Sequence, residues 1–213
     1  KRLEDIYTVN AENSGVDIFK GKASFLNKKS VEINNKQLVG KKIIVAVGGY
    51  PKKLDVPGFN YCLDSDKIMQ LKKIPKSLSI IGAGYIAIEF AFIFSLLGSK
   101  VSLICRNKIL KGFDADLVKH LSDSLAKNGV NVLYNKEVDS IELKEKLKII
   151  KLKNSKKTLK ANEVLVAIGR IPNTEGLSLN KASVRQEKDF SIKVNSKLET
   201  NVKNIFAIGD VTN

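Results

Sequence analysis

Three small residues in the middle of the sequence have the spacing of a pyrophosphate-binding turn. Gly82-x-Gly84-x-x-Ala87 follows an apolar run at residues 78–81 and opens a longer apolar stretch that ends at Gly98. In such a turn the first glycine permits a tight bend, the second leaves room for phosphates, and the small third residue lets the helix lie close to the sheet. The pyrophosphate then lies at the helix N-terminus, where unpaired N–H groups and the helix dipole favour negative charge. The pattern therefore predicts a dinucleotide-binding site.

The residues after the next apolar run, at 100–104, favour a phosphorylated coenzyme. An NAD site usually carries Asp or Glu at this point, where the carboxylate accepts hydrogen bonds from the ribose 2′-hydroxyl. Here the position is Cys105, Arg106 follows it, and Lys108 and Lys111 come shortly after. A carboxylate would repel a 2′-phosphate, whereas an arginine can bind one with two parallel hydrogen bonds. The sequence therefore favours NADPH, and the alternative is that Arg106 is an ordinary surface cation.

The elements that must position these residues alternate between strands and helices. Buried strands are predicted at residues 78–81 and 100–104, with helices at 85–97 and at about 114–127. A further buried strand, at 163–168, again ends in glycine. Such alternation implies right-handed crossovers and a parallel sheet, so the sequence predicts an α/β fold.

The flanking segments predict shorter elements. Residues 42–47 form a continuous apolar run that ends in glycine, as a strand buried on both faces does. Pro51 and Pro57 then mark a linker. The remaining predicted elements are a helix at 3–13, strands at 16–19, 21–25, 31–33, 130–133, 138–143, 147–152 and 204–210, a further strand that begins at 158–159, and a hairpin turn at Asn34-Asn35.

Composition argues against several classes of protein. The formal net charge is +15, but the lysines are spread along the chain and no basic stretch is interleaved with aromatic residues, which disfavours nucleic-acid binding. No apolar run approaches the roughly 18 residues of a membrane helix, so no membrane partner is expected. Two distant cysteines, Cys62 and Cys105, and a single histidine, His120, favour neither a metal site nor a disulfide framework. We therefore expect a reducing, cytoplasmic compartment.

Taken together, several motifs resemble those of the pyridine nucleotide-disulfide oxidoreductases, which are flavoenzymes with two dinucleotide sites. They are Ile-Ile-Val-Ala-Val-Gly-Gly at residues 43–49, the block at 82–91, and Thr200 followed after six residues by Ala-Ile-Gly-Asp at 207–210. Residues 82–91, 167–174 and 209–213 are most similar to the glutathione reductase branch. The resemblance implies a Rossmann-like two-dinucleotide-binding flavoprotein fold, FAD and NADPH as cofactors, glutathione disulfide as substrate, and a homodimer.

At matching positions the resemblance implies roles for single residues. Tyr85 matches a tyrosine that covers the nicotinamide pocket, and Glu89 matches a glutamate near the nicotinamide. Because Ile86, Ile88, Phe90 and Phe92 surround Glu89 in sequence, we expect this carboxylate to be largely buried and functional. The residues implied in NADPH binding are Gly82, Ala83, Gly84, Tyr85, Ile86, Glu89, Arg106, Lys111, Gly169 and Arg170, and those implied in FAD binding are Ala23 at the adenosine side, Gly48, and Asp210 at the ribityl chain.

The resemblance also implies a division into three parts. Residues 1–50 would be the later part of an FAD-binding domain, 51–172 the NADPH-binding domain, and 173–213 a return to the FAD or central domain. The family's first glycine fingerprint and its redox-active C-x-x-x-x-C pair would precede residue 1, and its interface domain, with a His-Glu pair, would follow residue 213. We therefore expect a fragment and assign no catalytic residue within it.

One departure and several alternatives remain at this stage. Val47 stands where the family commonly has threonine, so one hydrogen bond to the flavin is in doubt. Another NADPH-dependent member, similar to trypanothione reductase or mercuric reductase, would carry its substrate residues outside this chain. Dihydrolipoamide dehydrogenase fits less well because it uses NAD. A non-catalytic nucleotide-binding module and, more distantly, a nucleic-acid-binding protein with salt-dependent affinity are the alternatives from other classes.

Overall fold

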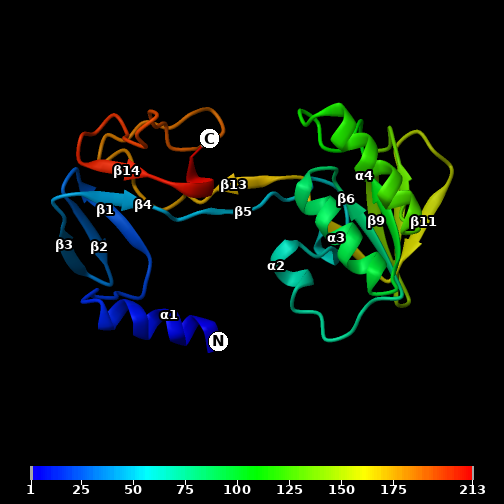
Figure 1. Ribbon diagram of the computed structural model, residues 1–213, viewed down its shortest axis with the longest axis horizontal. Helices are drawn as coiled ribbons and strands as arrows, with labels where there is room; N and C mark the ends of the chain where they lie inside the picture. The colour runs from blue at the N-terminus through cyan, green and yellow to red at the C-terminus, as the bar shows by residue number, and fades with distance from the viewer. Residues whose placement is uncertain (1, 213) are drawn as a thin grey trace. The chain divides into compact units, whose positions relative to one another are not determined.

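The chain forms two compact units, which the computed structural model describes over residues 2–212. The first unit comprises Lys1–Gly49 and Ile171–Asn213, and the second comprises Tyr50–Arg170. The chain passes between them through two short strands, β5 (Gly49–Pro51) and β13 (Arg170–Pro172), which pair with each other (Figure 1). No helix within residues 2–212 is both long and apolar enough to cross a membrane.

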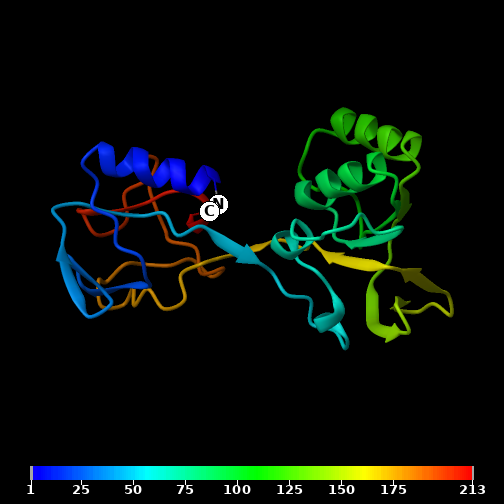
Figure 2. The ribbon, with the colours of Figure 1, turned by 90° about the horizontal axis from the view of Figure 1, so that it is seen from below.

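The second unit is built on a four-stranded parallel sheet in the order β12-β6-β7-β8. Helices α3 and α4 cover one face of this sheet, and the antiparallel sheet β9–β11 lies on the other (Figure 2). The elements of this unit are η1 (Phe59–Tyr61), α2 (Ser65–Ile68), β6 (Ser77–Ile81), α3 (Tyr85–Leu96), β7 (Lys100–Ile104), α4 (Ala115–Lys127), β8 (Asn131–Leu133), β9 (Val138–Lys144), β10 (Leu147–Leu152), β11 (Thr158–Ala161) and β12 (Glu163–Val166).

Side-chain alternation along the central strand explains how one sheet supports two cores. Leu78 and Ile80 of β6 pack with α3, whereas Ile81 packs with the antiparallel sheet. Successive residues of a strand point to opposite faces, so an apolar run such as this one fills both layers. The prediction of a parallel sheet is confirmed for the second unit.

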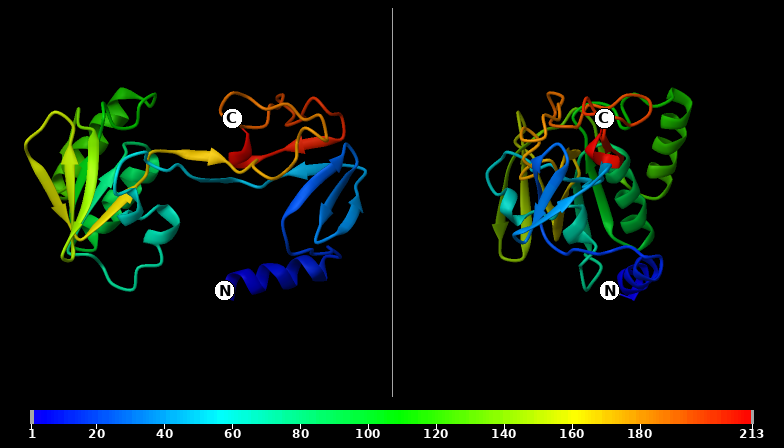
Figure 3. Two further views of the ribbon diagram at one scale, coloured as in Figure 1. Left: turned by 180° about the vertical axis from the view of Figure 1, so that it is seen from behind. Right: turned by 90° about the vertical axis from the view of Figure 1, so that its left-hand side faces the viewer.

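The first unit consists mainly of strands and turns. It contains α1 (Arg2–Asn13), the antiparallel meander β1 (Ala23–Asn27), β2 (Ser30–Ile33) and β3 (Lys36–Val39), and the parallel pair β4 (Ile43–Val45) and β14 (Ile205–Ala207), followed by the 3₁₀ turn η2 (Gly209–Val211). Figure 3 shows the meander beside the β4–β14 pair. Buried apolar side chains of β1, β4, β14 and residues 177–192 form the core of this unit.

The local predictions differ in their outcome. The hairpin turn at Asn34-Asn35 is confirmed, since both residues have positive φ, as a two-residue hairpin loop requires. The strand expected at 16–19 is wrong, because β1 begins only at Ala23. The run at 42–47 is also not buried on both faces: β4 forms a two-stranded sheet with β14, and Ile44 is 62% exposed.

Candidate functional site

Three loops meet at one edge of the four-stranded sheet in the second unit. They follow β6, β12 and β7 and contain residues 82–84, 167–169 and 105–111, respectively. Because the strands are parallel, these loops all lie at the carboxyl edge, where open α/β sheets bind their ligands. The fold thus brings together most of the residues that the sequence implied in NADPH binding.

The two glycines of the turn are required for different reasons. Gly82 has a φ of 137°, and a Cβ there would collide with the carbonyl oxygen of Ala167. A Cβ on Gly84 would meet nothing within 4 Å, and its φ of −82° suits any residue. The fold therefore requires glycine at position 82 but not at 84, where the absent side chain leaves open space for a ligand.

The start of α3 offers hydrogen-bond donors toward that space. The first helical hydrogen bond runs from the N–H of Ile88 to the carbonyl oxygen of Gly84 at 3.1 Å, so the preceding N–H groups have no partner within the helix. Gly84 is the N-cap and supplies no capping side chain. Ala87 is 0% exposed and packs in the core beneath the helix. This arrangement fits an anionic group at the helix N-terminus.

Three cations follow β7 on an exposed loop. Arg106, Lys108 and Lys111 are exposed, and none has a carboxylate within 4.0 Å among residues 2–212. Between them Ile109 and Leu110 are buried in the core of the unit. The loop therefore holds its charges toward solvent, where an anion such as a phosphate could be bound.

Cys105 occupies the place where an NAD site would have a carboxylate. Its side chain is 0% exposed and shares the apolar core of the second unit. Burial raises the pKa of the Cys105 thiol, and this effect outweighs the opposing influence of the Asn107 backbone. The thiol is therefore neutral at physiological pH and adds no negative charge beside Arg106.

The expectation of a buried Glu89 is wrong. Glu89 is exposed, although its neighbours Ile88 and Phe90 are buried. Residues three or four apart share one face of a helix, so Glu89 lies on the outer face with Tyr85, which is 55% exposed. Adjacent apolar residues in the sequence say little about the burial of the residue between them in a helix.

The remaining NADPH-side residues lie around the same edge. Gly169 has a φ of 123°, and its carbonyl oxygen accepts a hydrogen bond from the N–H of Lys52 at 2.9 Å. Arg170 begins β13 and is half-buried, as are Ala83 and Ile86.

The FAD-side residues gather at the carboxyl end of the β4–β14 pair in the first unit. Gly48 follows β4 with a φ of 67°, and the exposed Asp210 lies in the turn after β14. The two segments are adjacent, since the N–H of Ile208 donates to the carbonyl oxygen of Val45 at 3.0 Å. Ala23 begins β1 and lines a hollow of about 180 Å³ beside them. That hollow is lined by Ala23, Ser24, Phe25, Val31, Ile43, Ile44, Val45, Ala46, Val47 and Leu177.

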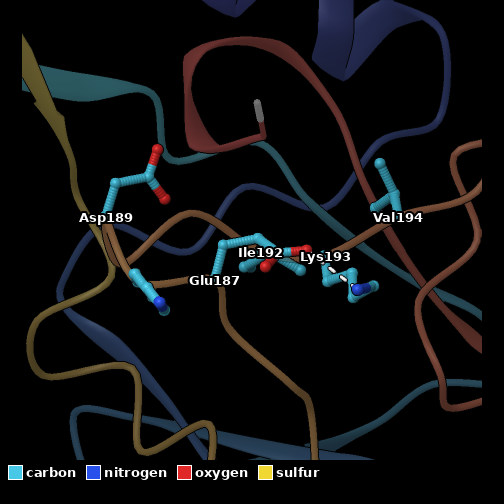
Figure 4. A pocket seen from close by; sticks show the side chains of 6 residues that line it. Glu187, Asp189, Ile192, Lys193 and Val194 are labelled. Carbon is cyan, nitrogen blue, oxygen red and sulfur yellow. Dashed lines mark ion pairs between the residues drawn. The ribbon is translucent and has the colours of Figure 1, made fainter.

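A larger hollow of about 490 Å³ lies in the first unit and contains none of the predicted residues. Figure 4 shows that charged side chains line it, and Glu187 and Lys193 form an ion pair of 3.1 Å. Hydrogen bonds from the Ser191 hydroxyl and N–H lower the pKa of Asp189. Two of its charged side chains are thus paired with each other, and its size alone gives no reason to prefer it to the two strand edges.

Neither cysteine offers redox or metal chemistry in the structure. Cys62 and Cys105 are both free and buried in the second unit. Burial raises the pKa of Cys62 to about 11, with the Lys148 ammonium opposing the rise. Among residues 2–212 no group of three or more His, Cys, Asp or Glu residues is arranged to hold a metal ion.

Comparison with known proteins matches the whole chain to one family model. The model described as pyridine nucleotide-disulphide oxidoreductase covers residues 1–213. A glutathione reductase from Nostoc sp. is 37% identical over 225 residues, which cover 100% of this chain and 49% of that protein. A mercuric reductase from Staphylococcus aureus is 34% identical over 206 residues, or 94% of this chain and 38% of that protein.

A solved structure supports the same grouping. The HOCl-induced flavoprotein disulfide reductase RclA from Escherichia coli matches with a TM-score of 0.87 at 29% identity, over 95% of this chain and 47% of that one. The chain thus spans half the length or less of these three relatives.

Proposed function

Since the chain belongs to the pyridine nucleotide-disulphide oxidoreductase family, whose model it matches from residue 1 to residue 213, we propose that it works in an NADPH-dependent flavoprotein disulfide reductase. The proposed substrate is glutathione disulfide, in line with the glutathione reductase relatives at 36–37% identity. A homodimer and a cytoplasmic location belong to the same proposal.

The second unit is the proposed NADPH site, and the observation that carries it is the open space in front of Gly84. A glycine that the fold does not require stands at an uncapped helix N-terminus, next to a loop of three unpaired cations. The N–H groups at the start of α3 would hold the pyrophosphate, and Arg106 would bind the 2′-phosphate with support from Lys111. Tyr85, exposed at the helix start, would cover the nicotinamide end.

The first unit is the proposed partial FAD site. Ala23, Gly48 and Asp210 lie around the carboxyl end of the β4–β14 pair and its apolar hollow. Ala23 would contact the adenosine, the backbone of Gly48 would approach the flavin, and Asp210 would accept hydrogen bonds from ribityl hydroxyls. Val47 lacks the hydroxyl that a threonine would offer here, so this residue contributes apolar contact only.

The cofactors supply the electron chemistry, because NADPH donates a hydride that a bound flavin accepts before electrons pass to a disulfide. The chain's own residues orient the coenzyme and neutralise its phosphates. Cys62 and Cys105 are not proposed as the redox pair, because both are buried and protonated in the core of the second unit.

The experiment that tests this function is steady-state coenzyme oxidation by the product of the complete reading frame. The rate with NADPH and the rate with NADH would each be measured with four electron acceptors in turn. The acceptors are glutathione disulfide, trypanothione disulfide, lipoamide and Hg²⁺. Fast turnover with NADPH and glutathione disulfide alone is expected. Turnover of Hg²⁺ would instead support a mercuric reductase, which the 34% identical relative also favours, and preference for NADH would refute the role of Arg106.

A further inference from the structure

The loop that carries the three cations is fixed to the glycine turn at its far end. The N–H of Leu110 donates a hydrogen bond of 2.8 Å to the carbonyl oxygen of Ala83, the residue between the two glycines. Leu110 and Ile109 are buried beneath the loop at 5% and 2% exposure. Lys111 therefore follows a residue whose position is set by the pyrophosphate-binding turn itself.

The near end of the loop is fixed by the thiol of Cys105. The Cys105 Sγ donates a hydrogen bond of 3.1 Å to the carbonyl oxygen of Asn107, closing the bend at whose centre Arg106 lies. The backbone of Cys105 is itself held by the neighbouring segment, since its N–H donates to Leu133 and its carbonyl oxygen accepts from Lys136, both at 3.0 Å. The bend therefore begins at a residue whose backbone is held on both sides by hydrogen bonds.

These contacts leave the loop with a fixed backbone and exposed charges. Residues 106–108 are exposed, whereas Cys105 before them and Ile109 and Leu110 after them are buried. A binding group that is already held in place loses less conformational entropy when its ligand arrives, which raises affinity for that ligand. The gain in affinity applies to the ligand group that contacts the loop, and not to the pyrophosphate at α3.

We propose that Cys105 is a positioning residue for 2′-phosphate recognition, in which its buried thiol holds the bend that presents Arg106. The inference rests on the proposed NADPH function. Cys105 then differs from an NAD-site carboxylate in two ways, because it removes a repelling charge and it shapes the loop through a hydrogen bond. Its neutral thiol keeps the proton needed to donate, in agreement with the raised pKa of this buried group.

The test compares two nucleotides that differ only in the 2′-phosphate. Equilibrium titration of the 213-residue chain with adenosine 2′,5′-bisphosphate and adenosine 5′-monophosphate gives the ratio of the two dissociation constants. The variant Cys105→Ala removes the donor, Cys105→Ser restores one, and Cys62→Ala is the matched control. Cys62 is also a buried cysteine of the second unit, but within residues 2–212 its thiol has no hydrogen bond to a carbonyl.

We expect the preference for the bisphosphate over the monophosphate to depend on a hydrogen-bond donor at position 105. A hydrogen bond contributes about 0.5–1.5 kcal/mol net, so Cys105→Ala should lower the preference for the bisphosphate about twofold to tenfold. Cys105→Ser should stay within about twofold of the natural protein, and Cys62→Ala should not change the ratio although it loses stability. If Cys105→Ala does not fold, Cys105→Val, which leaves no cavity and has no donor, carries the same expectation.

Two outcomes would overturn the inference, and they are distinguishable. If the natural chain and Arg106→Ala bind both nucleotides equally well, the NADPH proposal fails and the positioning role fails with it. If the natural chain prefers the bisphosphate and Arg106→Ala abolishes the preference, but Cys105→Ala retains it in full, only the positioning role is refuted.

Discussion

Replacing Gly84 by alanine separates the requirement of the fold from the requirement of the ligand. The added Cβ would meet no protein atom within 4 Å, and the backbone at φ −82° and ψ 179° is open to any residue. Alanine is a poorer N-cap than glycine, but it also reduces the entropy of the unfolded chain. Because these two effects oppose each other, the free energy of unfolding should change by less than about 1 kcal/mol.

Coenzyme binding should respond far more strongly than stability. The methyl group would occupy the space in front of the α3 N-terminus, where the pyrophosphate must approach the N–H groups. Hydrogen bonds to a charged group contribute about 1.5–3 kcal/mol each. Loss of one corresponds to binding that is weaker by about tenfold to 150-fold.

Gly82→Ala is the matched control, in which the main loss is expected in stability and not in coenzyme binding. Gly82 has a φ of 137°, and its Cβ would collide with the carbonyl oxygen of Ala167, so unfolding should become easier by about 3 kcal/mol or more. The assays are urea-induced unfolding and a fluorescence titration with NADPH for both variants. If Gly84→Ala binds NADPH within twofold of the natural chain, the pyrophosphate does not lie at this helix. If the Gly84→Ala variant is unfolded, the conclusion that a Cβ fits at position 84 without a clash is refuted.

Four further predictions concern the second unit. Both thiols should react slowly with a thiol reagent at pH 8 in the native state and quickly in denaturant, because burial raises the pKa of Cys62 to about 11 and also raises that of Cys105. The pKa of Cys62 in the folded state lies above that of the unfolded thiol, which is about 8.5. The contribution of this thiol to the free energy of unfolding is therefore complete below about pH 8.5 and is lost as the pH rises toward 11. Urea unfolding measured as a function of pH would detect this loss. Gly58→Ala should destabilise the unit by about 3 kcal/mol, because Gly58 has a φ of 83° and its Cβ would collide with the backbone carbonyl of Ile141; thermal unfolding that matches the natural chain would contradict this. Asp114→Ala should cost about 1 kcal/mol, because the Asp114 carboxylate accepts hydrogen bonds from two N–H groups at the start of α4, while Asp114→Asn should retain most of that energy in the same melt.

Periodicity and turn chemistry predicted the second unit well. The helix that ends before Gly98, the helix capped by Asp114, and the strands β6, β7 and β12 lie close to where the sequence placed them. Each of these features is decided within a few residues: a positive φ at Gly98, an acceptor at Asp114, and apolar runs of strand length. The family resemblance, carried by short motifs at loops, is supported by the match over residues 1–213.

The wrong predictions share a cause. Glu89 and Ile44 lie within apolar segments, and both are exposed. An apolar segment shows that some face is buried, but which side chains face the core depends on the phase of the helix or on the layers that cover a strand. The segment at 42–47 had the composition of a strand buried on both faces, but β4 lies in a two-stranded sheet.

The sequence by itself determined the types and order of the groups that define the nucleotide site. It placed two glycines before a helix, a small residue in the first turn of that helix, and a cysteine and cations after the next strand, because these choices depend on local backbone geometry and charge. Only the tertiary structure decided that Gly82 is required by the neighbouring strand whereas Gly84 is not, and that the Cys105 thiol and the Leu110 N–H fix the cation loop. Such contacts join residues through the sheet edge and its core, and no spacing along the chain specifies the distance between two atoms brought together by packing.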